Sequence, residues 1–198
     1  TGVAQPEDDK VWETALSRGM ALSPHFGFGD RFAGQGAAGG MSYTAACGEL
    51  AKTAGDHHPV HTMMQLMVSG VLDRFPELRF YFAESEVSWL PTAMARMDKN
   101  YATFKTWFNV ELKMLPSEYI KKHFYFGLVT DPFVIQMQHI LPMEHLMWGS
   151  DFPHAAGTFP NSEAALENGE AGVPPEWARK ILLETPAEYY GLDLEKPL

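Results

Sequence analysis

Cysteine is nearly absent from the sequence, with Cys47 alone among 198 residues. A single cysteine excludes an internal disulfide, which fits a reducing compartment such as the cytoplasm. Basic side chains are also few, because 15 Lys and Arg stand against 25 Asp and Glu, and the formal net charge is −10. Without a basic cluster, this balance argues against binding to nucleic acid or to an anionic membrane.

Long apolar runs are missing as well, since none reaches the roughly 18 residues of a membrane-spanning helix. The first ten residues lack the basic and apolar regions of a signal peptide. The sequence also has no initiator Met, so we expect a segment or a processed form. What is present is typical of a globular chain, with 45% hydrophobic and 13% aromatic residues. We expect one domain over residues 1–198, although a complete (β/α)₈ barrel typically needs about 250 residues.

Apolar segments that predict strands alternate with segments that predict helices. We expect strands over residues 20–24, 78–83, 124–127 and 146–149. We expect helices over 8–18, 59–74, 87–107, 117–122, 131–140, 174–183 and 187–190, with Asp131 as a helix cap. Residues 26–58 are rich in glycine and predict a long loop. The alternation predicts an α/β fold with a parallel sheet.

Three of these strands end in a side chain that could bind a metal, namely His25, Glu84 and Asp151. In parallel β/α folds, functional sites gather at the carboxyl ends of the strands. Imidazole nitrogen and carboxylate oxygen are suitable ligands for zinc, manganese or iron. Each residue also has a purely structural interpretation, because His25 could satisfy a local hydrogen bond and either acid could cap the following helix.

Asp151 is the strongest candidate, because it follows an apolar strand directly within Trp148-Gly-Ser-Asp-Phe-Pro-His154. A carboxylate there could bind a metal and accept a proton from metal-bound water. His154 could orient a substrate or shuttle a proton, and its alternative is an ordinary loop histidine. Ser150 and Trp89 are candidate substrate contacts, with core packing as the alternative for Trp89.

Three motifs are similar to those of the amidohydrolase-related family, which includes aminocarboxymuconate-semialdehyde decarboxylase and the hydroxybenzoate decarboxylases. The first runs from Gly70 to Pro91 and contains Phe-Ala-Glu-Ser-Glu-Val-Ser-Trp, and the second is Met147-Trp-Gly-Ser-Asp-Phe-Pro-His154. The third, Arg179 to Leu192, resembles the closing helix of that family. The resemblance covers nearly the whole chain.

The resemblance implies a (β/α)₈ TIM-type barrel with one divalent metal, zinc first, with manganese or iron as alternatives. It places His25 at the fifth strand and Asp151 at the eighth, and Glu84 where decarboxylase relatives carry histidine. Thr185-Pro186 stands where relatives have Asn-Ala. The expected strands would then be strands 5–8 of a partial barrel, whose open edges require a second copy of the chain or an N-terminal half.

Three functions are compatible with these residues. The first is a metal-dependent hydrolase of a small molecule, with Asp151 accepting a proton from the attacking water. The second is a non-oxidative decarboxylase of an aromatic or enoic carboxylic acid. The third is a truncated barrel fragment with no bound metal and no turnover. The first two use the same residues, so the sequence does not separate them.

Overall fold

The computed structural model describes residues 4–24 and 58–196. The N-terminal segment holds η1 (Pro6–Asp8) and α1 (Asp9–Ser17). The second segment contains α3 (His58–Val68), α4 (Val71–Arg74), β1 (Phe80–Phe82), α5 (Leu90–Phe108), α6 (Pro116–His123), β2 (Phe124–Leu128), α7 (Val134–Met137), η2 (Met143–His145), β3 (Leu146–Trp148), α8 (Ser162–Glu167), η3 (Pro175–Trp177), the π-helix η4 (Lys180–Glu184) and α9 (Thr185–Tyr190). Among the described helices, none is long and apolar enough to cross a membrane.

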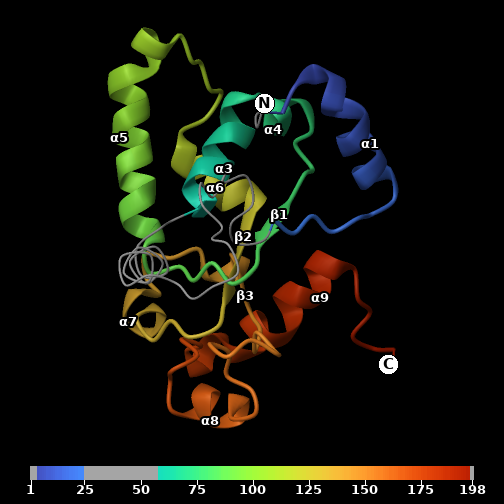
Figure 1. The fold of residues 1–198 in the computed structure, drawn as a ribbon, viewed down its shortest axis with the longest axis vertical. Coiled ribbons are helices and arrows are strands. Elements are labelled where there is room, and N and C mark those ends of the chain that lie inside the picture. The colour runs from blue at the N-terminus through green and yellow to red at the C-terminus, as the bar shows by residue number, and fades with distance from the viewer. Residues whose placement is uncertain (1–3, 25–57, 197–198) are drawn as a thin grey trace, which may run out of the picture.

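The three strands form one parallel sheet in the order β1-β2-β3 (Figure 1). In this sheet, Phe126 of β2 is in register with Phe82 on one side and Leu146 on the other. The segment expected as a strand over residues 20–24 contributes one parallel bridge, between Leu22 and Phe80. The parallel arrangement predicted from the sequence is therefore present in three strands, with Leu22 beside the outer edge of β1.

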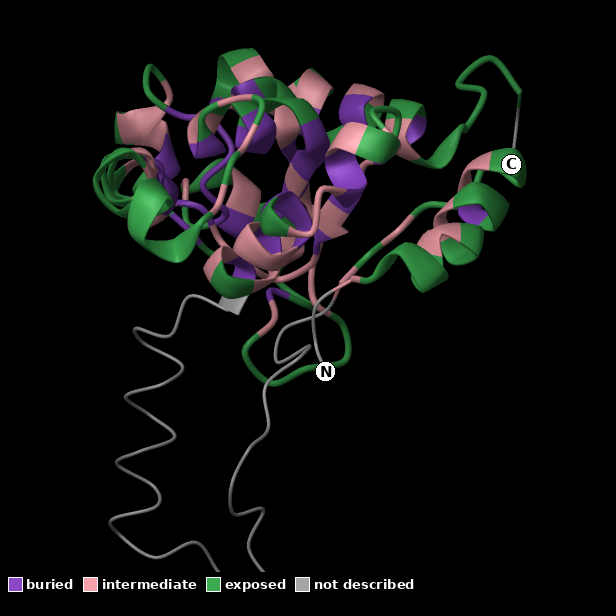
Figure 2. Cartoon of the chain, turned by 90° about the horizontal axis from the view of Figure 1, so that it is seen from above, coloured by how far each residue is buried: buried purple, intermediate pink, exposed green. Residues whose placement is uncertain are grey.

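The two faces of the sheet carry different side chains because residues alternate along a strand. Phe80, Phe82, Phe124 and Phe126 are almost fully buried and belong to the main core, to which α3, α5 and α6 contribute. Buried residues gather in the interior, inside the surrounding helices (Figure 2). The phenylalanine rings of β1 pack against those of β2, and this packing holds the two strands firmly beside each other.

The opposite face of the sheet carries Tyr81 and Tyr125. The ring of Tyr189 from α9 lies 5.9 Å from that of Tyr81 and 4.9 Å from that of Tyr125, measured between ring centroids. The Tyr189 hydroxyl also donates to the carbonyl of Leu22 at 2.7 Å. The last helix therefore ties the second face of the sheet to the N-terminal segment.

The helix expected over residues 131–140 is shortened to Val134–Met137, and two other expected helices differ from the structure for identifiable reasons. The helix expected over residues 59–74 is divided into α3 and α4 at Gly70, which has a left-handed φ of 69°. The closing helix contains the π-helical turn η4 immediately before Thr185-Pro186. Because Pro186 has no N–H for the carbonyl one turn earlier, the regular α-helical pattern is interrupted there.

The expectation that Asp131 caps the helix after it was wrong. The cap position of α7 is Phe133, and no side chain caps that helix. Asp131 is 3% exposed, and its carboxylate accepts hydrogen bonds from the backbone of Val87 and Ser88 in the preceding β/α unit. The Asp131 carboxylate therefore binds backbone amides about forty residues earlier in the chain instead of capping the helix that follows it.

Candidate functional site

Glu84 and Asp151 occupy equivalent places, shortly after β1 and β3, at the carboxyl edge of the sheet. Both have left-handed backbone conformations, with φ of 54° for Glu84 and 57° for Asp151. Such conformations are uncommon for residues other than glycine, and they concentrate at functional sites because surrounding contacts must maintain them. Both side chains are half-buried. The edge predicted from the sequence thus has carboxylates on constrained backbone after two of its strands.

Asp151 begins a tight loop. The amide of His154 donates to the Asp151 carbonyl at 2.8 Å, and the amide of Thr158 donates to the Ser150 carbonyl at 2.9 Å. Gly157 closes this loop against the carbonyls of Ser150 and Asp151, where a β-carbon would collide with both. Ser150 is half-buried, whereas His154 is exposed. The loop therefore places Ser150 beside Asp151 and leaves the imidazole of His154 in contact with solvent.

Trp89 lies at the start of α5, and its indole N–H bonds to the loop that carries Glu84. Its Nε1 donates to the carbonyl of Ser85 at 2.9 Å and to that of Glu86 at 3.2 Å. Its ring meets Phe126 edge to face, with centroids 6.1 Å apart. Trp89 thus supports the loop after β1 from the core, in addition to any contact with a substrate.

Glu86 is a site residue that sequence reasoning missed. Its carboxylate crosses to the loop after β2, where it accepts hydrogen bonds from the amides of Val129 at 3.2 Å and Thr130 at 2.9 Å. Burial raises the pKa of Glu86 to about 7; the two amides oppose this shift, and repulsion from Asp131 and Asp151 adds to it. The spacing Glu84-Ser-Glu86 was the available signal, because a second acid follows the first within the same loop.

The raised pKa of Glu86 predicts a pH dependence of stability. Between about pH 4.5 and 7 the folded protein binds this proton more than the unfolded chain does, so stability falls as the pH rises through that window. We expect the ionisation of Glu86 to lower the free energy of unfolding by about 3 kcal/mol between these two pH values. Denaturant unfolding at a series of pH values measures this effect. As the pH rises, the free energy of unfolding should fall less steeply for Glu86→Gln than for the unmodified protein. Parallel declines would contradict the assignment.

The described residues include side chains of the types that bind a metal, but too few of them lie together to form a complete ligand set. Carboxylate oxygens at two strand ends suit zinc or manganese. Within residues 4–24 and 58–196, however, no group of three His, Cys, Asp or Glu side chains is arranged to hold an ion. His25 and most of the glycine-rich segment 26–58 lie outside the described residues. A complete ligand set therefore requires groups beyond those that the structure describes.

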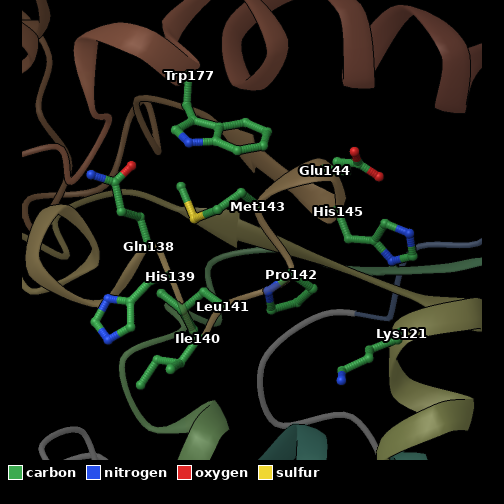
Figure 3. A pocket seen from close by; sticks show the side chains of 10 residues that line it. All are labelled: Lys121, Gln138, His139, Ile140, Leu141, Pro142, Met143, Glu144, His145 and Trp177. Carbon is green, nitrogen blue, oxygen red and sulfur yellow. The ribbon is translucent and has the colours of Figure 1, made fainter.

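A cavity of about 630 Å³ lies at the other end of β3, at the amino side of the strand (Figure 3). It is formed by the end of α6, the connection between α7 and β3, and η3. The lining residues are Lys121, Gln138, His139, Ile140, Leu141, Pro142, Met143, Glu144, His145 and Trp177. None of the expected site residues is among them. In β/α barrels the chemistry takes place at the opposite, carboxyl end.

Comparison with known protein families decides the classification. The family model described as amidohydrolase matches residues 4–192. This chain belongs to the amidohydrolase family. The match spans nearly the whole sequence and includes all three motifs recognised from the sequence. No curated protein matches the chain.

Several solved structures resemble this amidohydrolase chain. An amidohydrolase from Mycobacterium avium subsp. paratuberculosis K-10 is 20% identical, with a TM-score of 0.68 over 97% of this chain and 47% of its own length. The 5-carboxyvanillate decarboxylase of Sphingomonas paucimobilis is 21% identical, with a TM-score of 0.64 over 96% of this chain and 54% of its own. A dihydroxybenzoic acid decarboxylase from Polaromonas sp. JS666, solved with manganese and 2-nitroresorcinol, is 16% identical, with a TM-score of 0.67 over 98% and 55%.

These similarities establish an amidohydrolase fold, which is of the TIM-barrel type, and identify the relatives as amidohydrolase-related enzymes that include decarboxylases. The chain spans about half the length of each of these solved proteins. At this level of identity the likeness concerns the fold.

Proposed function

We propose that this chain supplies strands 5–8 of an amidohydrolase barrel and takes part in metal-dependent hydrolysis of a small molecule. The observation that carries the proposal is the carboxyl edge of the sheet, where Asp151 and Glu84 are held on left-handed backbone at two strand ends. Family membership supports the same location. The completing strands belong to an N-terminal half or to a second copy of the chain.

His25, Glu84 and Asp151 are the proposed ligands of a divalent metal, zinc or alternatively manganese or iron. When bound, such an ion lowers the pKa of water towards neutrality and polarises a carbonyl. The role proposed for Asp151 is to accept a proton at its carboxylate as water attacks the carbonyl carbon. Ser150, next to Asp151, and Trp89 would contact the substrate, and exposed His154 would exchange protons with solvent.

Hydrolysis suits this edge because acids gather there, and repulsion from Asp131 and Asp151 raises the pKa of Glu86. Negative charge in excess of what the proposed divalent metal neutralises favours a neutral ester, amide or lactone over an anionic substrate. Decarboxylation of an aromatic acid is the second candidate, and the observation that favours it is the number of decarboxylases among the similar structures.

Turnover assays on the full chain separate the candidates. After incubation with zinc or manganese, the protein is offered a panel of esters, amides and lactones and, separately, hydroxybenzoates with detection of released CO₂. Hydrolysis without CO₂ release supports the proposal, and CO₂ release replaces it with the decarboxylase. Absence of turnover together with absence of bound metal by elemental analysis would contradict completion of the site by a second copy of the chain, in favour of a fragment that is not catalytic by itself.

A further inference from the structure

The loops that follow β1 and β2 are joined by two carboxylates. Each loop supplies one carboxylate, which binds backbone amides of the other loop. Glu86, from the loop after β1, binds the amides of Val129 and Thr130 after β2. Each of its two oxygens lies within 3.3 Å of the Val129 nitrogen.

Asp131, from the loop after β2, makes the reciprocal connection. Its Oδ2 accepts from the amides of Val87 at 2.8 Å and Ser88 at 2.7 Å, in the loop after β1. We call the pair Glu86 and Asp131, with the four amides that they bind, the reciprocal clamp. Since both carboxylates are engaged with backbone amides, neither is presented as a free metal ligand.

The reciprocal clamp is supported from three sides. The Gly127 carbonyl accepts the amides of Ser85 and Glu86, both at 3.1 Å, at the end of β2. The indole of Trp148, on β3, donates to the carbonyl of Val129 at 3.1 Å. Gly172, with a φ of 70°, packs its α-carbon against the backbone carbonyl of Asp131, where a β-carbon would not fit. The clamp therefore joins the loops after β1 and β2, and Trp148 connects it to the end of β3.

The loop that the clamp holds contains two left-handed residues, Glu84 with φ of 54° and Glu86 with φ of 48°. Non-glycine residues leave this conformation unless their surroundings fix it. We infer that Glu86 and Asp131 are positioning residues, whose function is to keep Glu84 in its left-handed conformation at the carboxyl edge. This inference rests on the proposed function only in treating Glu84 as a site residue.

The conformation of Glu84 is the direct readout, because it can be followed without a metal or a substrate. A positive φ brings the amide and α hydrogens of one residue close together and gives a strong NOE between them. In Asp131→Ala we expect that NOE at Glu84 to weaken, and the amides of Val87 and Ser88 to exchange with solvent about tenfold faster. Asp131→Asn retains one acceptor oxygen and should recover part of both signals.

Glu118→Gln is the matched control, because Glu118 also accepts a backbone amide, that of Leu115 at 2.7 Å, away from the strand ends. It should leave the Glu84 NOE and the exchange of Val87 unchanged. If Asp131→Ala fails to fold, Asp131→Asn combined with Glu86→Gln provides the same test. An unchanged Glu84 NOE and unchanged Val87 exchange in a folded Asp131→Ala protein, or in the folded double variant, would overturn the inference.

The proposed function and the role of the reciprocal clamp are tested by different measurements, so one can fail while the other holds. If Glu84→Gln leaves turnover and bound metal as in the unmodified protein, Glu84 is no ligand, whereas the NOE and exchange results still decide whether the clamp fixes its backbone. A loss of the Glu84 NOE in Asp131→Ala but not in Glu118→Gln supports the inference in either case.

Discussion

Truncation of Phe126 to alanine is expected to lower the free energy of unfolding by about 3–5 kcal/mol. Phe126 lies in the central strand and is fully buried. Its ring stacks on Phe82 at 6.1 Å between centroids and meets Trp89 edge to face at the same distance. The loss combines the transfer free energy of the ring with the cavity left between two strands and α5, which rigid neighbours cannot fill.

Equilibrium unfolding in denaturant measures this loss, provided that the dependence on denaturant keeps its slope. Phe133→Ala is the control, since the same side chain is 60% exposed at the start of α7 and its truncation should cost less than about 0.5 kcal/mol. A loss below about 1 kcal/mol for Phe126→Ala would show that the sheet does not depend on the packing of Phe126 against Phe82 and Trp89.

The fold class followed from the sequence because the strands of a parallel sheet are buried and therefore apolar. Residues 78–83, 124–127 and 146–149 are short, largely apolar runs; the first and last contain β1 and β3, and β2 extends one residue beyond the second. The segment 20–24 is less apolar, and it forms a single bridge at Leu22. Local sequence thus located the strand ends, and with them the places of Glu84 and Asp151.

The partners of the acids could not be inferred in the same way. A local rule assigned Asp131 to the helix that follows it, but the carboxylate binds amides 43 and 44 residues earlier. Glu86 likewise reaches Val129, 43 residues away. Such bonds depend on which strand ends lie side by side in the sheet, and the pairing of β1 with β2 in the register Phe82 to Phe126 is not visible in local sequence.

Asp151→Asn is expected to reduce turnover by about a thousandfold, within the 10²–10⁴-fold range of general acid–base groups. Asparagine has nearly the same shape, and it tolerates the left-handed backbone observed at Asp151 better than most residues do. The loop from Ser150 to Thr158 should therefore keep its hydrogen bonds. What is lost is the negative charge and the capacity to accept a proton at the carboxyl edge.

The measurement is kcat/KM on whichever substrate the turnover panel identifies, with thermal unfolding to verify that the variant is folded. His154→Ala serves as the comparison within the same loop; because His154 is exposed, its removal should cost no more than about tenfold. A folded Asp151→Asn protein that retains more than about a tenth of the activity would exclude Asp151 as proton acceptor. Glu84 would then be the next carboxylate on left-handed backbone to test as proton acceptor, because both oxygens of Glu86 already bind backbone amides.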